Sequence, residues 1–199
     1  MTPQRSLCLA SSSPRRQEIL KALGLEFSVK AIEVDEDRLA DETPEQMVVR
    51  LATAKASAAE MEASCLVIGS DTVVVLGDEV LGKPRDRDEA VAMLLRLSGR
   101  RHFVLTGVAL RGPDGVQTAL SSTEVCFREI SRDEARAYWH SGEPRDKAGA
   151  YGIQGLGGAF VEAIKGSYSG VVGLPVFETA RLLQDAGIDV LAKQNDHDG

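Results

Sequence analysis

Long apolar runs are absent from this chain of 199 residues. None approaches the roughly 20 apolar residues that are needed to cross a bilayer. The residues before Leu7 lead into only four strand-like residues, a run too short for the core of a signal peptide. We therefore expect a cytoplasmic protein that has no membrane partner.

Cysteine and histidine are scarce, with three of each. Cys8, Cys65 and Cys126 are far apart and lie in apolar stretches, which favours reduced core thiols over a disulfide or a reactive thiol. The histidines form no His-Glu-x-x-His motif and have no neighbouring cysteine pair, so a zinc site has no support. A metal site would need carboxylate ligands, which suit Mg²⁺ or Mn²⁺.

The chain also lacks an excess of positive charge, because its formal net charge is −7. This argues against a nucleic-acid polymer or an anionic membrane as a partner, and an anion site would need locally concentrated basic residues. The composition, 43% hydrophobic and 27% charged, excludes collagen-like, coiled-coil and disordered chains. The length suits a single domain over residues 1–199, either one compact unit or two joined lobes.

Predicted strands and helices alternate along most of the chain, as is typical of an α/β fold. Cap residues and proline mark the predicted helix starts, for example Thr43 with Gln46 and Ser131 with Glu134. The predicted strands cover about 7–10, 66–76, 102–110, 116–127 and 159–164. The predicted helices cover about 14–23, 44–61, 87–97, 132–139 and 175–187. We expect a glycine-rich loop at 142–158 and a turn at 166–170.

A candidate phosphate site lies where the first strand ends and the first helix begins. Arg15 and Arg16 add positive charge to the first helical turn, whose dipole already favours anions. The hydroxyls of Ser11 and Ser13 add hydrogen-bond donors, and the whole arrangement suits a phosphate. Alternatively, Ser13 only caps the helix and both arginines are solvated, and the local pattern does not separate the two interpretations.

Two charged residues stand out because their surroundings are apolar. Asp71 interrupts an apolar strand, where a carboxylate costs several kcal/mol unless it is paired or bound to a metal. This favours a functional acid over a bulge that exposes the acid to water. Lys55 follows Leu51 and Ala52 at helical spacing, so its stem lies on the apolar face of a helix. It can reach a buried anion there or extend from the core edge to solvent.

Three further segments have both a functional and a plain interpretation. The acidic run around Glu36 is usually a solvated loop, but with Asp71 it can hold a hard divalent ion if the fold brings the two together. Lys83 lies in a constrained turn and by itself is weak evidence for a functional site. In the segment 146–155 the glycines permit close approach to a ligand, while Tyr151 and Gln154 offer an aromatic face and an amide that can read a base edge. The same segment can be a flexible connection, and it carries neither a Rossmann nor a P-loop motif.

Taken together, these motifs resemble the Maf family of nucleoside triphosphate pyrophosphatases, first named as septum-formation inhibitors. The resemblance runs along nearly the whole chain. Its motifs are Leu-Ala-Ser-Ser-Ser-Pro-Arg-Arg at 9–16, Ser-Asp-Thr at 70–72, Gly-Lys-Pro at 82–84, Ser-Gly at 98–99, Thr-Gly-Val at 106–108, Asp-Lys-Ala-Gly-Ala-Tyr-Gly-Ile-Gln-Gly at 146–155, Ile-Lys-Gly-Ser-Tyr at 164–168 and Val-Val-Gly-Leu-Pro at 171–175. The form of the late loop resembles the subfamily that acts on dTTP and UTP.

The resemblance implies an α/β fold with a mixed, twisted central sheet flanked by helices, in two lobes with a cleft between them, commonly in a homodimer. It implies hydrolysis of a nucleoside triphosphate to the monophosphate and pyrophosphate with a divalent metal, Mg²⁺ or Mn²⁺. Asp71 matches the proton acceptor, and Glu36 matches an acid placed near the metal, where Asp71 can also act as a ligand.

The resemblance also implies a set of substrate-binding residues. Arg15, Thr72 and Gln154 match positions tied to substrate choice. Lys55 and Lys83 match lysines that bind the triphosphate. With Arg16 and Lys147 they supply local positive charge for a substrate that carries about four negative charges.

Three hypotheses follow. The first is an enzyme that hydrolyses dTTP, UTP and related modified pyrimidine triphosphates. The second is a nucleotide-binding regulator of cell division or septum formation, for which turnover is incidental. The third is a pyrophosphatase that prefers a modified purine such as 7-methyl-GTP.

Overall fold

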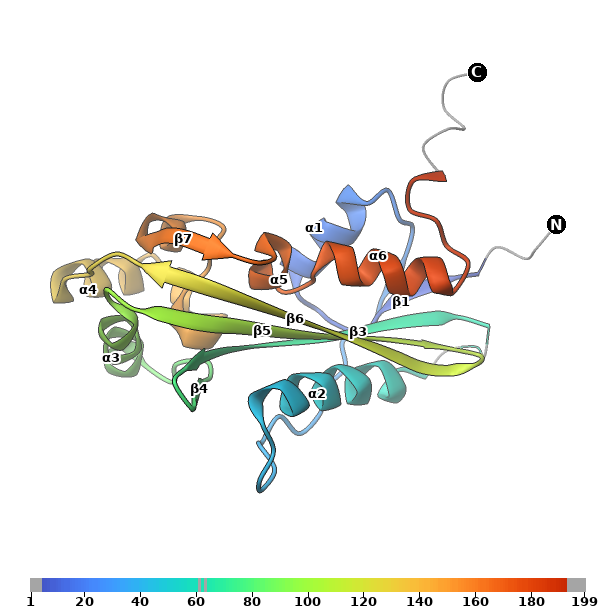
Figure 1. The fold of residues 1–199 in the computed structure, drawn as a ribbon, viewed down its shortest axis with the longest axis horizontal. Helices are drawn as coiled ribbons and strands as arrows, with labels where there is room; N and C mark the ends of the chain where they lie inside the picture. Colours follow the sequence, from blue (N-terminus) through green and yellow to red (C-terminus); the bar gives the residue numbers. More distant parts are fainter. Residues whose placement is uncertain (1–4, 61, 63, 193–199) are drawn as a thin grey trace, which may run out of the picture. The chain divides into compact units, whose positions relative to one another are not determined.

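The computed structural model describes residues 5–60, 62 and 64–192, which contain one seven-stranded mixed sheet (Figure 1). Its strand order is β2-β1-β3-β5-β6-β7, and β4 pairs with β3. Strand β1 runs parallel to β2 and β3, whereas β4 is antiparallel to β3 and β7 is antiparallel to β6. The strands are β1 (Leu7–Leu9), β2 (Ser28–Val29), β3 (Leu66–Leu76), β4 (Glu79–Leu81), β5 (Arg101–Gly112), β6 (Gly115–Phe127) and β7 (Val161–Lys165).

Six α-helices and three 3₁₀ turns accompany the sheet within the described residues. The α-helices are α1 (Pro14–Ala22), α2 (Pro44–Ala58), α3 (Arg87–Leu97), α4 (Arg132–His140), α5 (Tyr168–Val172) and α6 (Val176–Asp185). The 3₁₀ turns are η1 (Glu143–Asp146), η2 (Ala148–Ala150) and η3 (Leu156–Phe160). The predicted α/β fold with a mixed sheet flanked by helices is therefore confirmed. No helix in the described ranges is both long enough and apolar enough to span a membrane.

Local capping chemistry explains why the predicted helix starts are correct. Thr43 forms a capping box with Gln46 at the start of α2, and Ser131 forms one with Glu134 at the start of α4. Ser13 precedes α1 as predicted, but its side chain caps no backbone N–H. Helix α2 ends at Ala58, before the predicted end at position 61, which lies outside the described residues.

The elements that were not predicted include strands β2 and β4 and helix α5. Strand β2 has two exposed residues and so lacks an alternating apolar pattern. Helix α5 overlaps the segment 166–170. This segment was predicted as a turn because of its glycines. The Ser167 Oγ accepts a hydrogen bond from the Gly170 N–H at 3.0 Å and so supports the first turn of this helix. Cys8 and Cys65 are free and buried, as predicted for core thiols, whereas Cys126 is free but only half-buried.

The chain divides into two compact units. Unit 1 contains the described residues of 1–71, 106–121 and 173–199, and unit 2 contains 72–105 and 122–172. Strands β3, β5 and β6 therefore contribute residues to both units. The predictions of a single domain over 1–199 and of a cleft between two lobes stay predictions.

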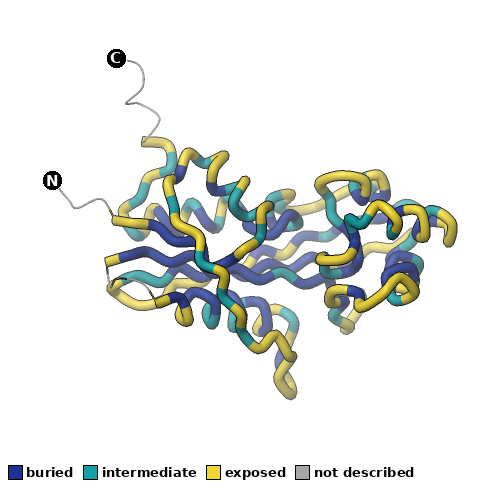
Figure 2. Tube along the Cα trace, turned by 180° about the vertical axis from the view of Figure 1, so that it is seen from behind, coloured by how far each residue is buried: buried dark blue, intermediate teal, exposed yellow. Residues whose placement is uncertain are grey.

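In unit 1 successive side chains of each strand point alternately into two apolar clusters, one on each face of the sheet. Helix α2 covers one face, and α1 and α6 cover the other (Figure 1). The cluster under α2 contains Cys8, Ala10, Ala52, Ala56, Ala59, Cys65, Val67 and Ala109. The cluster under α1 and α6 includes Leu7, Leu9, Leu20, Leu66, Ile68, Val108, Leu182 and Leu183. Figure 2 shows that buried residues follow the strands and that the segment before α2 is exposed.

Two glycines let α2 lie directly on the strands of unit 1. A Cβ on Gly69 of β3 would stand 2.1 Å from the Ala52 carbonyl oxygen, and one on Gly107 of β5 would stand 2.4 Å from that of Val48. Both contacts are with helix backbone, which cannot move aside as a flexible side chain can. This close packing fixes α2, and with it Lys55, against the face of β3 that carries Gly69.

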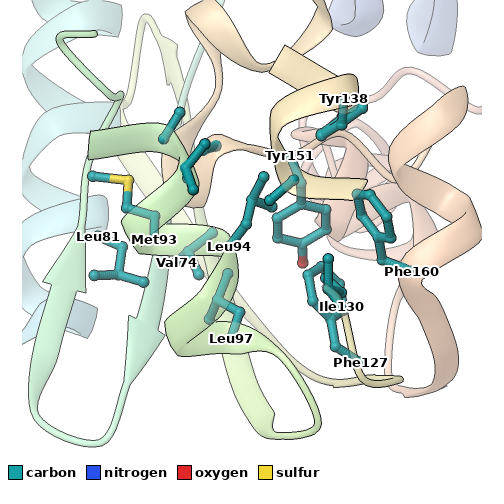
Figure 3. Packing of buried hydrophobic residues seen from close by; sticks show 14 of the residues in the cluster. Val74, Leu81, Met93, Leu94, Leu97, Phe127, Ile130, Tyr138, Tyr151 and Phe160 are labelled. Carbon is teal, nitrogen blue, oxygen red and sulfur yellow. The ribbon is translucent and has the colours of Figure 1, made fainter. Parts of the chain in front are cut away.

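Unit 2 is built around aromatic rings and the apolar face of α3 (Figure 3). Tyr151 packs edge-on against Phe127, with ring centroids 4.6 Å apart, and Tyr138 packs edge-on against Phe160 at 5.1 Å. The Tyr151 hydroxyl and His102 Nε2 form a buried hydrogen bond of 2.8 Å. The structure therefore contradicts the expectation that Tyr151 offers its ring to a ligand, because this side chain is part of the core.

Candidate functional site

The first cluster of candidate residues lies in unit 1, around the side chain of Lys55. Its Nζ lies 2.6 Å from Asp71 Oδ1 and 2.7 Å from Glu36 Oε1. Lys55 and Asp71 are only 7% and 8% exposed, whereas the Glu36 side chain is 47% exposed. One ammonium group thus joins a buried carboxylate to a carboxylate at the surface. The formal charges of the three groups sum to −1.

The sequence explains how Lys55 reaches Asp71. Residues 67, 69 and 71 of β3 share one face of the sheet because side chains alternate along a strand. That face is covered by α2, whose Ala52 contacts Gly69. Lys55 follows Ala52 by one helical turn, so its stem runs along the covered face to Asp71. Lys55 therefore contacts a buried anion, as one of its two predictions states. The alternative that Lys55 extends to solvent is wrong, and so is the alternative that Asp71 is exposed to water.

A second cluster in unit 1 includes Arg16 and Ser11, also predicted as site residues. Arg16 Nε donates to the carbonyl oxygen of Gly173 at 2.9 Å, and one terminal nitrogen donates to Ser11 Oγ at 3.1 Å. Ser70 Oγ donates to the same Gly173 carbonyl at 2.9 Å. Burial lowers the pKa of the Arg16 guanidinium, and the charge of Asp71 acts in the opposite direction. Arg16 thus ties α1 to the segment before α6.

Three further predicted residues, Ser13, Arg15 and Thr72, lie at the start of α1 and on β3. Ser13 and Arg15 are half-buried at the start of α1, and the Ser13 N–H donates to Ser11 Oγ at 3.2 Å. The serines therefore form a hydrogen-bonded loop at the helix start. Thr72 follows Asp71 on β3 and is half-buried, but it belongs to unit 2.

The other predicted residues lie in unit 2. Lys83 is exposed in the loop after β4, and Gln154 is exposed between η2 and η3. Lys147 is half-buried, and its Nζ donates to the Glu143 carbonyl oxygen at 2.6 Å and to Asp146 Oδ1 at 2.7 Å. Lys147 and Gln154 thus share one glycine-rich segment.

Glu143 is a residue that the sequence analysis missed. Its carboxylate accepts hydrogen bonds from the Tyr138 hydroxyl at 2.6 Å and from the N–H groups of Leu156 and Gly157 at 3.0 and 3.1 Å. It therefore anchors the segment that carries Gln154. A signal was present in the sequence, since one acid precedes a run of glycines that can fold around it.

Glu36 and Asp71 are the residues that could bind a metal. Both point an oxygen at the same Nζ, so their carboxylates converge on one position in unit 1. Among the described residues, no group of three or more Asp, Glu, His or Cys side chains is arranged to hold an ion. Two carboxylates are nevertheless enough for Mg²⁺ when substrate phosphates supply further oxygens. The donor set therefore fits a hard divalent cation bound together with a phosphate ligand.

Unit 1 brings cationic side chains and a buried carboxylate together, and cationic side chains of this kind can bind phosphate. Arg16 and Lys55 supply positive charge, and Asp71 supplies a buried base that Lys55 keeps in one orientation. A positioned carboxylate of this kind can accept a proton from water.

Comparisons with known proteins identify a family and several similar proteins. The family described as Maf-like protein matches residues 6–186. A dTTP/UTP pyrophosphatase of Hahella chejuensis is 50% identical over 192 residues, which cover 94% of this chain and 95% of that protein. Proteins of the same name from Saccharophagus degradans and Vibrio cholerae are 53% and 52% identical. Their alignments cover 89% of this chain in both cases, and 87% and 96% of the relatives.

Proposed function

This chain belongs to the Maf family, and we propose that it hydrolyses dTTP and UTP to the monophosphate and pyrophosphate. The observation that carries the proposal is the buried Lys55–Asp71 pair with Glu36 beside it. The names of relatives about 50% identical over most of their length support the substrates. The proposed enzyme is a cytoplasmic homodimer with nucleoside triphosphates as its partners.

In the proposed reaction, water adds across the α–β phosphoanhydride bond. One proton of the water passes to Asp71, the phosphoanhydride bond breaks, and pyrophosphate leaves. Lys55 donates to Oδ1 of Asp71, so we assign the proton to the other carboxylate oxygen, Oδ2. A base held in one orientation typically contributes at least about 100-fold to the rate.

Basic side chains are assigned to phosphate oxygens and neutral side chains to the nucleobase. In unit 1, Arg15, Arg16 and Lys55 would bind phosphate oxygens. In unit 2, Lys83 and Lys147 carry charge that suits a phosphate. Ser11 and Ser13 add hydroxyl donors, and Thr72 and Gln154 supply neutral hydrogen-bonding groups for substrate choice.

A divalent cation, Mg²⁺ or Mn²⁺, would be held by Glu36 and substrate phosphate oxygens and, when bound, would offset the negative charge of the phosphates. In the alternative assignment, Asp71 holds the cation instead of accepting the proton. Removal of the cation with a chelator should therefore abolish turnover, and added Mg²⁺ should restore it.

Product identification tests the proposed function. The purified protein is incubated with Mg²⁺ and a panel of dTTP, UTP, GTP and 7-methyl-GTP, and the products are separated by chromatography. We expect monophosphate and pyrophosphate in equal amounts, formed fastest from dTTP and UTP. Diphosphate and inorganic phosphate would place the cleavage at another bond, and preferential turnover of 7-methyl-GTP would contradict the base class. Binding of UTP without turnover would favour the regulator.

A further inference from the structure

The segment between η2 and η3 in unit 2 is folded around the carboxylate of Glu143. Three donors converge on this carboxylate: the Tyr138 hydroxyl and the N–H groups of Leu156 and Gly157. The Tyr138 hydroxyl also accepts a hydrogen bond from the Gly152 N–H at 3.1 Å. Both ends of the segment 152–157 are therefore tied to one hydrogen-bonded pair, the buried Tyr138 and the half-buried Glu143.

Three glycines make this arrangement sterically possible. A Cβ on Gly155 would stand 2.7 Å from Glu143 Oε2, and one on Gly157 would stand 2.4 Å from the Tyr138 hydroxyl. A Cβ on Gly152 would stand 2.7 Å from the Lys147 side chain. Gly155 also has a φ of +116°, which side chains rarely adopt. A side chain at Gly157 would also meet the Gly152 carbonyl oxygen at 2.5 Å, whereas one at Gly152 or Gly155 would displace the end of the Lys147 or Glu143 side chain, so the glycines allow close approach to Tyr138, Glu143 and Lys147.

The protonation states suit this network. Burial raises the pKa of Tyr138, and its hydrogen bond to Glu143 acts in the same direction, so the hydroxyl stays a donor. Burial alone would raise the pKa of Glu143, but the hydrogen bonds from Tyr138, Gly157 and Leu156 lower it overall. Glu143 is thus a carboxylate that accepts from neutral donors, with the Lys147 ammonium bound to its carbonyl oxygen.

We propose that Glu143 is a positioning residue for base selection, which holds the segment 152–157 so that the exposed amide of Gln154 meets the pyrimidine. This inference rests on the proposed function. Gln154 lies within the anchored segment, two residues from each of Gly152 and Leu156, and the backbone on both sides of it is fixed by Tyr138 and Glu143. An amide can discriminate bases only when its donor and acceptor are held in place.

The test is the Glu143→Gln variant. A glutamine side chain keeps the size of glutamate, but its NH₂ group is a donor and would face N–H or O–H donors. We expect kcat/KM for UTP to fall about tenfold relative to kcat/KM for GTP, because the hydrogen bonds that the Glu143 carboxylate accepts are weakened or lost. We also expect faster amide hydrogen exchange in the peptide that contains 152–157, a readout that needs no activity.

Two further variants complete the experiment. Glu129→Gln makes the same chemical change at an exposed residue of unit 2 and should leave both the substrate ratio and the exchange unchanged. Tyr138→Phe removes the hydroxyl that joins Glu143 to Gly152, and it should change both readouts in the same direction as Glu143→Gln. If Glu143→Gln does not fold, Tyr138→Phe tests whether the anchored segment controls base selection.

Each outcome is informative. A merely structural role of Glu143 would lower the activity toward UTP and GTP by the same factor, so an unchanged ratio would overturn the proposal even if exchange became faster. Unchanged exchange would show that Glu143 does not hold the segment. A wild-type protein that hydrolyses neither dTTP nor UTP would instead contradict the proposed function, and the exchange experiment would still test the anchoring of the segment.

Discussion

The two units bury polar groups in different ways. In unit 1 the buried polar groups include a charged pair, Lys55 and Asp71, and the half-buried Arg16 is tied to a carbonyl and a hydroxyl. In unit 2 the buried pair of His102 and Tyr151 consists of neutral rings. The carboxylate of Glu143 is likewise held by hydroxyl and N–H donors.

The two kinds of polar group differ in what they can do for function. A buried ion pair keeps each charge in place only while its partner is present, and its groups can also bind a phosphate or a cation. In unit 2 a network of neutral donors holds the carboxylate of Glu143 and fixes the backbone that it joins. We therefore assign the proton transfer to unit 1 and the control of segment geometry to unit 2.

Removing the positive charge from unit 1 should have the largest effect on stability. Lys55→Met leaves Asp71 buried without its ammonium partner, and loss of one member of a buried pair costs about 3–5 kcal/mol. We expect the free energy of unfolding, measured by urea denaturation, to fall by this amount.

The matched control for this prediction is Glu36→Gln, which removes the exposed carboxylate that contacts the same Nζ. Exposed ion pairs contribute about 0–1 kcal/mol, so this variant should be nearly as stable as the wild type. The double variant Lys55→Met, Asp71→Asn should recover part of the loss because it leaves no charge at either position. Equal losses for Lys55→Met and Glu36→Gln would contradict the distinction between buried and exposed pairing.

Protonation of the buried His102 in unit 2 should have the next largest effect on the free energy of unfolding. His102 is 1% exposed, and burial lowers its pKa from about 6.5 to about 4. The unfolded chain therefore binds a proton between pH 6.5 and pH 4 that the folded chain does not. The contribution of His102 is complete above pH 6.5 and is lost progressively as the pH falls to 4, by about 3 kcal/mol in total.

The comparison with His102→Gln isolates this contribution from those of the carboxylates. Urea denaturation of both proteins at several pH values between 7 and 4 should show a steeper fall of stability for the wild type. Parallel pH profiles would mean that His102 is not held in its neutral form.

Much of the fold was predictable because it follows from local chemistry. The capping boxes at Thr43 and Ser131 fix helix starts through contacts three residues apart, and these were predicted correctly. Helix α5 was missed because its support comes from Ser167 inside a glycine-flanked segment, where local patterns predict a turn.

The site was predictable only in part. The position of Lys55 on the apolar face of its helix could be deduced from spacing, because helical periodicity determines it. The contact between Arg16 and Gly173 spans 157 residues and depends on the tertiary fold. Tyr151 was assigned to a ligand because aromatic residues in glycine-rich loops look the same whether they pack inward or outward. Glu143 was missed because two of its donors, Leu156 and Gly157, act through backbone N–H groups, so the run of glycines after this acid is the main trace that the contact leaves in the sequence.

The most direct test of the account is the rate of hydrolysis of UTP and dTTP by Asp71→Asn. An asparagine oxygen can still accept the hydrogen bond from Lys55, but an amide cannot accept a proton from water. We expect a loss of at least about 100-fold in kcat in a protein whose thermal unfolding shows that it is folded. A folded Asp71→Asn protein with full activity would remove Asp71 from the chemistry and contradict the account.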